Sequence, residues 1–88
     1  MSEYLFTEDG MEDYLYWQTQ DRKTLKKINS LLKEISRDPF KGEGKPEPLK
    51  GENGKWSRRI TDEHRMIYSV SSGCIYIFVF SLRYHYSK

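Results

Sequence analysis

Two prolines in the middle of the chain limit the kind of sheet that it can form. Pro46 and Pro48 flank Glu47. Proline lacks the backbone N–H that a central strand donates, and it holds the preceding residue extended, so this segment is predicted to be an edge strand. Lys45 and Lys50 lie nearby and favour the ionised form of Glu47. The segment therefore presents either a rigid general base or an exposed strand with solvated charges.

The first forty residues are predicted to form a short strand and two helices. An apolar run at residues 4–6 precedes Thr7, which can cap a helix over residues 8–20 with an acidic first turn. Asp21 can cap a second helix over residues 22–36. Its apolar stripe, which we expect to pack on the sheet, comprises Leu25, Ile28, Leu31, Leu32 and Ile35. The basic residues off this stripe form either a solvated face or a contact for RNA phosphates.

The second half of the chain is predicted to be an antiparallel sheet. Strands are expected over residues 56–61, 64–70 and 74–84, with turns at residues 62–63 and 72–73. The last strand has apolar residues on both faces, which predicts an interior place in the sheet. The fold class is therefore α+β: a short N-terminal strand, two helices, then an antiparallel β-meander with the helices packed on one sheet face.

Length and composition agree with one compact domain over residues 1–88. Aromatic residues make up 15% of the chain, which is too many for a disordered protein. The net charge of +2 does not by itself indicate nucleic acid as a partner. Cys74 is the only cysteine, and neither a signal peptide nor an apolar run of membrane-spanning length is visible. We therefore expect a cytoplasmic protein without a membrane segment.

Side-chain alternation is predicted to bring two arginines together. If the apolar residues of the adjacent strands pack under the helices, Arg59 and Arg65 emerge side by side on the open face. Two neighbouring guanidinium groups repel each other unless an anion lies between them, and the arginine fork matches the oxygens of a phosphate. The alternative is a set of surface ion pairs with Asp62, Glu63 or Glu47.

These residues fit ribonuclease chemistry. Glu47 could act as the base, and Arg59 and Arg65 could bind the phosphate with the assistance of Lys50. His85 could act as the acid, because histidine exchanges a proton near neutral pH. The attacking group would be the RNA 2′-hydroxyl, so no metal or other cofactor is expected. The two histidines and one cysteine also lack the spacing of a zinc site.

Seven segments of the chain resemble one family of bacterial toxins. The most specific are Gly-Lys-Pro-Glu-Pro-Leu-Lys, Trp-Ser-Arg-Arg-Ile and the terminal Arg-Tyr-His-Tyr, and in order the segments are residues 13–18, 26–29, 38–40, 44–50, 56–60, 63–65 and 83–86. In this combination the chain resembles the YoeB (also called Txe) toxins of type II toxin–antitoxin systems, within the RelE-like superfamily. It differs from the family pattern in that Ser87 and Lys88 follow the final tyrosine.

The resemblance implies a ribosome-dependent mRNA interferase, an endoribonuclease that cuts mRNA in the ribosomal A site and inhibits translation. It implies Glu47 as general base, Arg65 as transition-state stabiliser and His85 as general acid. Tyr86 would orient the RNA, and the residues on phosphate would be Lys50 and Arg59. The implied partners are a YefM-like antitoxin, the ribosome with its mRNA, and a second copy in a homodimer. The alternatives are a non-catalytic RNA- or ribosome-binding module and a purely structural subunit.

Overall fold

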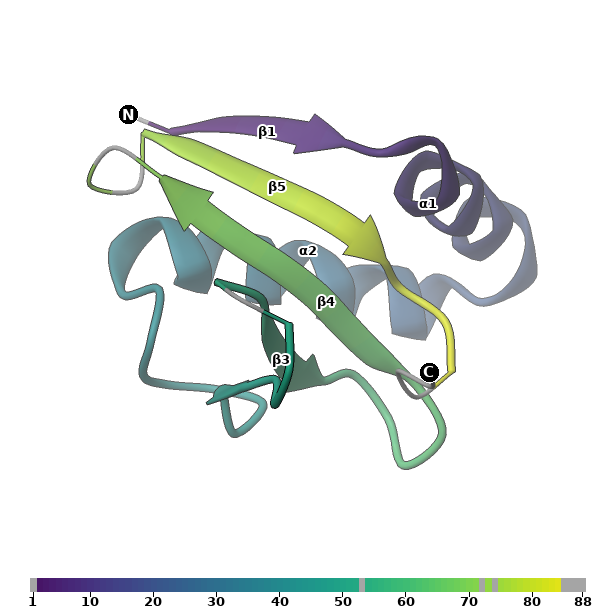
Figure 1. The fold of residues 1–88 in the computed structure, drawn as a ribbon. Helices are drawn as coiled ribbons and strands as arrows, with labels where there is room; N and C mark the ends of the chain where they lie inside the picture. Colours follow the sequence, from purple (N-terminus) through teal and green to yellow (C-terminus); the bar gives the residue numbers. More distant parts are fainter. Residues whose placement is uncertain (1, 53, 72, 74, 85–88) are drawn as a thin grey trace.

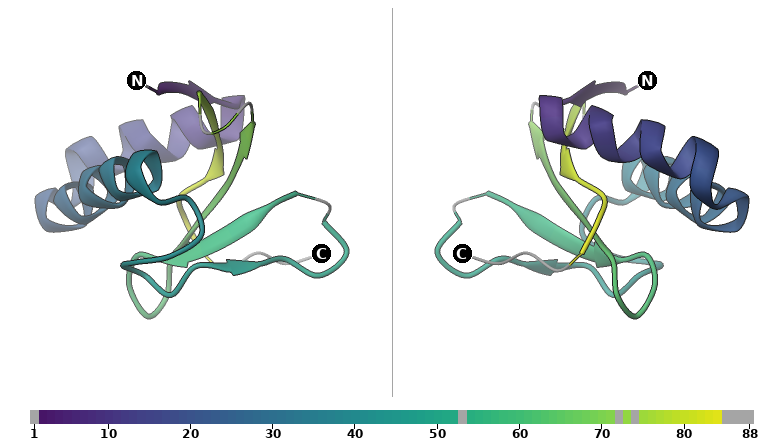
Figure 2. Two further views of the ribbon diagram at one scale, coloured as in Figure 1. Left: turned by 90° about the vertical axis from the view of Figure 1, so that its left-hand side faces the viewer. Right: turned by 90° about the vertical axis from the view of Figure 1, so that its right-hand side faces the viewer.

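The chain forms a five-stranded mixed sheet with two helices on one face (Figures 1 and 2). The computed structural model describes residues 2–52, 54–71, 73 and 75–84. The elements are β1 (Glu3–Phe6), α1 (Glu8–Gln20), α2 (Arg22–Arg37), β2 (Glu47–Pro48), β3 (Trp56–Arg59), β4 (Arg65–Ser71) and β5 (Tyr76–Ser81). The strand order is β1-β5-β4-β3-β2. The predicted α+β class is confirmed, and so is the interior place of the last strand.

The first strand pairs with the last one. β1 runs parallel to β5, whereas the other neighbouring strands are antiparallel. The helices α1 and α2 connect β1 to the rest of the sheet; in Figure 1, α2 lies behind β5 and β4, and α1 lies at the right, beyond the end of β1. α1 approaches β5 so closely at Gly10 that a Cβ atom there would clash with the carbonyl group of Val79. Only glycine fits at this point of contact.

β5 is shorter than the predicted strand over residues 74–84. It ends at Ser81 because two side chains of α1 form hydrogen bonds with the backbone N–H and carbonyl of the next residue. The N–H of Leu82 donates to the Asp13 carboxylate at 2.9 Å, and the Trp17 indole N–H donates to the Leu82 carbonyl at 3.0 Å. The chain therefore leaves the sheet after Ser81. The predicted turn at residues 72–73 and Cys74 lie partly or wholly outside the described residues.

Both predicted helix caps are present. The Thr7 hydroxyl accepts from the N–H of Gly10 at 3.1 Å, and the Asp21 carboxylate accepts from the hydroxyl of Thr24 at 2.9 Å. This bond and those from the N–H groups of Thr24 and Lys23 hold the pKa of Asp21 below its usual value, because they favour the charged form. The cap is consequently lost only when the solution becomes strongly acidic.

The core lies between α2 and the sheet. The predicted stripe of α2 is buried except for Leu25, which is partly buried. It packs with α1 and the sheet through Trp17, Ile60, Met66, Tyr68, Ile77, Val79 and Leu82. Among the described residues, no helix is long and apolar enough to cross a membrane.

β2 is an edge strand, as its two prolines predicted. It is only two residues long, and Glu47 lies opposite Ser57 while Pro48 lies opposite Trp56. Pairing resumes through the N–H of Leu49, which donates to the Lys55 carbonyl at 2.9 Å. Glu47 is thus held in the sheet at its exposed margin.

Candidate active site

The sheet register brings Glu47, Arg59 and Arg65 into one pocket. Arg59 lies directly opposite Arg65, and Glu47 lies opposite Ser57, two residues before Arg59. These side chains lie on the face away from the helices, as strand alternation predicted for the arginines. The pocket has a volume of about 200 Å³ and is lined by Gly44, Lys45, Glu47, Ser57, Arg59 and Arg65. Its lining carries three cations and one carboxylate, a balance that attracts an anion.

The guanidinium group of Arg65 is held by backbone carbonyls. Its Nη1 atom donates to the carbonyl oxygens of Thr61 at 2.7 Å, His64 at 3.2 Å and Asp62 at 3.3 Å. Its backbone N–H donates to the Tyr84 carbonyl at 3.1 Å. Arg65 is therefore oriented before any ligand arrives, which is what stabilising a transition state requires.

Arg59 is less constrained. Its side chain is exposed and forms an ion pair with Asp62 at 3.8 Å, the alternative that the sequence left open. The Asp62 side chain is 99% exposed, so water screens this pair strongly. A phosphate with two oxygens can replace such a partner at little cost.

A buried arginine holds the loop that leads to Glu47. The guanidinium group of Arg58 donates to the carbonyls of Asp38 at 2.7 Å, Lys41 at 2.8 Å and Glu43 at 3.0 Å. It also donates to the Tyr68 hydroxyl at 3.1 Å. Arg58 is fully buried, so these bonds replace its hydration and fix the path of residues 38–43.

Two consecutive residues with positive φ, Gly44 and Lys45, lead the chain from this loop to the pocket. Gly44 has a φ of +82°, and its carbonyl accepts from the N–H of Arg59 at 2.6 Å. Lys45 follows with a φ of +50°, a left-handed conformation that is uncommon outside glycine. Lys45 lines the pocket with Glu47; the sequence predicted that Lys45 lies near Glu47, but not that it belongs to the site. Lys50, expected on phosphate, is exposed and does not belong to the lining of this pocket.

His85 and Tyr86 lie outside the described residues, so their roles stay predictions. The described chain ends at Tyr84, whose carbonyl is bound by the N–H of Arg65. The residue that precedes His85 is therefore anchored next to the pocket. No group of three or more histidine, cysteine, aspartate or glutamate side chains suited to a metal ion occurs in the described part of the chain.

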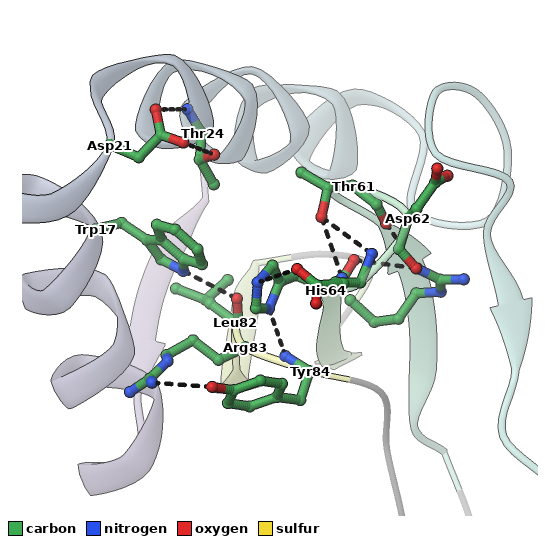
Figure 3. A network of polar contacts seen from close by, with 11 residues as sticks. Trp17, Asp21, Thr24, Thr61, Asp62, His64, Leu82, Arg83 and Tyr84 are labelled. Atoms are coloured by element: carbon green, nitrogen blue, oxygen red, sulfur yellow. Dashed lines mark hydrogen bonds and ion pairs between the residues drawn. The ribbon is translucent and has the colours of Figure 1, made fainter.

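His64 is a residue of this region that sequence reasoning did not single out. Its Nδ1 atom accepts from the N–H of Tyr84 at 2.7 Å, and its ring meets the ring of Trp17 edge to face at 4.9 Å (Figure 3). The signals in the sequence were its place directly before Arg65 and its position in residues 63–65, one of the segments that carry the family resemblance.

Comparison with known sequences identifies the relatives of this chain. Residues 6–86 match the model of the YoeB-like toxin of bacterial type II toxin–antitoxin systems. The chain is 51% identical to Toxin YoeB of Escherichia coli K12 over 83 residues, covering 93% of this chain and 96% of that protein. It is 54% identical to Toxin YoeB of Streptomyces coelicolor over 82 residues, covering 92% and 95% respectively.

Solved structures share the fold. The YoeB dimer from Staphylococcus aureus superposes with a TM-score of 0.89 at 45% identity, covering 97% of this chain and 98% of that one. The YoeB–YefM complex from the same organism superposes with a TM-score of 0.85 at 44% identity, covering 98% of this chain and 99% of that one. The archaeal RelE–RelB complex from Pyrococcus horikoshii superposes with a TM-score of 0.72 at 16% identity, covering 94% of this chain and 93% of that one. At this identity the two proteins share the fold alone.

Proposed function

The chain belongs to the YoeB family of type II toxin–antitoxin toxins, and we propose that it is a ribosome-dependent mRNA interferase. It would enter the ribosomal A site, cleave the mRNA there and stop translation, which makes the cytoplasm its place of action. The observation that carries this proposal is the pocket where one carboxylate, Glu47, lies with the paired arginines Arg59 and Arg65. A base beside a phosphate clamp is what cleavage through the 2′-hydroxyl needs.

In the proposed mechanism, Glu47 removes the proton of the RNA 2′-hydroxyl, and the freed oxygen attacks the adjacent phosphorus. Arg65, oriented by the carbonyls of residues 61, 62 and 64, stabilises the charge that develops on the phosphate oxygens, and Arg59 assists. His85 protonates the leaving 5′-oxygen, while Tyr86 orients the RNA. Lys50, which lies outside the pocket lining, would contact a flanking phosphate. The products are a 2′,3′-cyclic phosphate and a 5′-hydroxyl.

Substituting the proposed base tests this mechanism. Glu47→Gln keeps the shape of the side chain but removes its basicity, so the single-turnover rate on mRNA-programmed ribosomes should fall by about 10²–10⁴-fold. The matched control is Glu12→Gln, at an exposed glutamate of α1, which should cleave at the wild-type rate. Mapping the 5′ ends of the fragments measures both.

Two outcomes would contradict the mechanism or the function. Wild-type cleavage by Glu47→Gln would show that Glu47 is not the base. An inability of the wild-type protein to cut mRNA on any programmed ribosome, together with undiminished growth arrest, would favour the non-catalytic binding module.

For the partners, we propose a homodimer and a YefM-like antitoxin that covers the pocket. The titles of the S. aureus structures, a YoeB dimer and a YoeB–YefM complex, support this. A cationic pocket at an exposed sheet edge also suits an acidic segment that folds on binding. The co-purified complex should bury Arg59, Arg65 and His85, which hydrogen exchange and arginine modification can measure. Unchanged accessibility of all three in an inactive complex would contradict the proposal.

A further inference from the structure

We propose that His64 is a positioning residue of this active site. It fixes the backbone of Tyr84, the last residue before the proposed acid His85, and at the same time completes the turn that orients Arg65. The inference rests on the proposed ribonuclease function and adds a residue to it.

The imidazole of His64 is built into its place. Its Nδ1 atom accepts the Tyr84 N–H at 2.7 Å, so this nitrogen is unprotonated and the proton lies on Nε2. Nε2 lies 3.8 Å from the carboxylate of Glu63, and the His64 side chain is only 12% exposed. The ring packs between those of Trp17 and Tyr84, with centroid distances of 4.9 and 5.1 Å (Figure 3).

The hydrogen bond acts on a strained piece of backbone. Tyr84 has a φ of +61°, and only it and Lys45 combine a positive φ with a side chain among the described residues. Such a conformation persists where its surroundings hold it, and it often marks a functional site. Both backbone polar groups of Tyr84 are held: His64 accepts from its N–H, and the Arg65 N–H donates to its carbonyl at 3.1 Å. These two hydrogen bonds therefore fix the backbone of Tyr84, the residue directly before His85 in the sequence.

The backbone of the same residue serves the other half of the pocket. The His64 carbonyl accepts from the N–H groups of Ile60 at 2.9 Å and Thr61 at 3.2 Å, which closes the turn between β3 and β4. It also accepts from the guanidinium group of Arg65 at 3.2 Å. His64 thus contacts both Arg65, the proposed phosphate ligand, and Tyr84, the residue directly before the proposed acid in the sequence. A shift of about 1 Å between such groups can slow a reaction by about 100-fold.

Two conservative variants separate positioning from the other roles that a histidine can have. The Oδ1 atom of asparagine lies as many bonds from Cα as Nδ1 of histidine, so His64→Asn keeps an acceptor for the Tyr84 N–H. His64→Gln places its amide at the distance of Nε2 instead and loses that acceptor. Both variants remove the aromatic ring and the ability to exchange a proton near neutral pH.

The experiment compares single-turnover mRNA cleavage on programmed ribosomes with the exchange rate of the Tyr84 amide proton in the free protein. We expect His64→Gln to lower the cleavage rate constant by about 10- to 100-fold, with unchanged affinity for the ribosome, and to speed exchange at Tyr84. His64→Asn should recover most of both losses. Wild-type cleavage by His64→Gln, or equal losses in the two variants, would overturn the proposal, the second by indicating that the ring itself is required.

A measurement on the wild-type protein does not depend on the folding of any variant. The N–H···N bond should produce a scalar coupling between the Tyr84 amide nitrogen and Nδ1 of His64, and its absence would contradict the geometry. If the wild-type protein fails to cleave mRNA while this coupling and the variant exchange rates appear as expected, the proposed function fails and the structural role of His64 stands.

Discussion

Arg58 and Arg59 are adjacent in the sequence, but their guanidinium groups have opposite environments. Arg58 is fully buried and donates to three backbone carbonyls and a hydroxyl, whereas Arg59 is exposed at the pocket. Because successive side chains of a strand point to opposite faces, the two arginines of β3 lie on different sides of the sheet. The sequence could not predict the burial of Arg58, because its carbonyl partners lie in an irregular loop, residues 38–43, whose path follows from no residue pattern.

This contrast makes a prediction about stability. Arg58→Leu should lower the free energy of unfolding by about 3 kcal/mol or more, because each buried acceptor left without a donor costs about 1–3 kcal/mol. Arg59→Leu, the control on the same strand, should stay within about 0.5 kcal/mol of wild type, as surface substitutions do. Urea unfolding of the two variants gives the comparison, and equal effects would show that the loop does not depend on Arg58.

At the scale of elements, periodicity and capping were sufficient to predict the helices. Thr7 and Asp21 cap them as expected, and the stripe of α2 faces the sheet. The prolines correctly predicted the edge strand. The predicted end of the last strand was wrong, because the end of β5 depends on Asp13 and Trp17. These side chains are far away in the sequence and form hydrogen bonds with the backbone N–H and carbonyl of Leu82. The parallel pairing of β1 with β5 likewise depends on tertiary packing.

The assignment of the α2 stripe can be tested by truncation. Leu32 is buried in the core, so Leu32→Ala should cost about 2–5 kcal/mol of stability. Leu15, on α1, is 52% exposed, and Leu15→Ala should cost less than about 0.5 kcal/mol. Thermal or denaturant unfolding distinguishes the two, and a small loss for Leu32→Ala would mean that the helix face was misassigned.

At the scale of the whole molecule, the site is assembled from parts that are distant in the chain. The sequence predicted that Arg59 and Arg65 would meet, because their register follows from a short hairpin. It did not predict that Lys45 would line the pocket, since that depends on the left-handed backbone at Gly44 and Lys45. Nor did it single out His64, whose contacts come from α1 and from the segment after β5.

The central claim is that the RNA 2′-hydroxyl is the attacking group, with Glu47 as its base. The most direct test programs ribosomes with an mRNA that carries a single 2′-deoxy nucleotide on the 5′ side of the scissile phosphate. A 2′-deoxy nucleotide one position further downstream serves as the control and should leave cleavage intact. We predict that the first substitution abolishes cleavage, and that the unmodified mRNA yields a downstream fragment with a 5′-hydroxyl. Cleavage of the first deoxy substrate at the normal rate would contradict the mechanism and the roles given to Glu47 and His85.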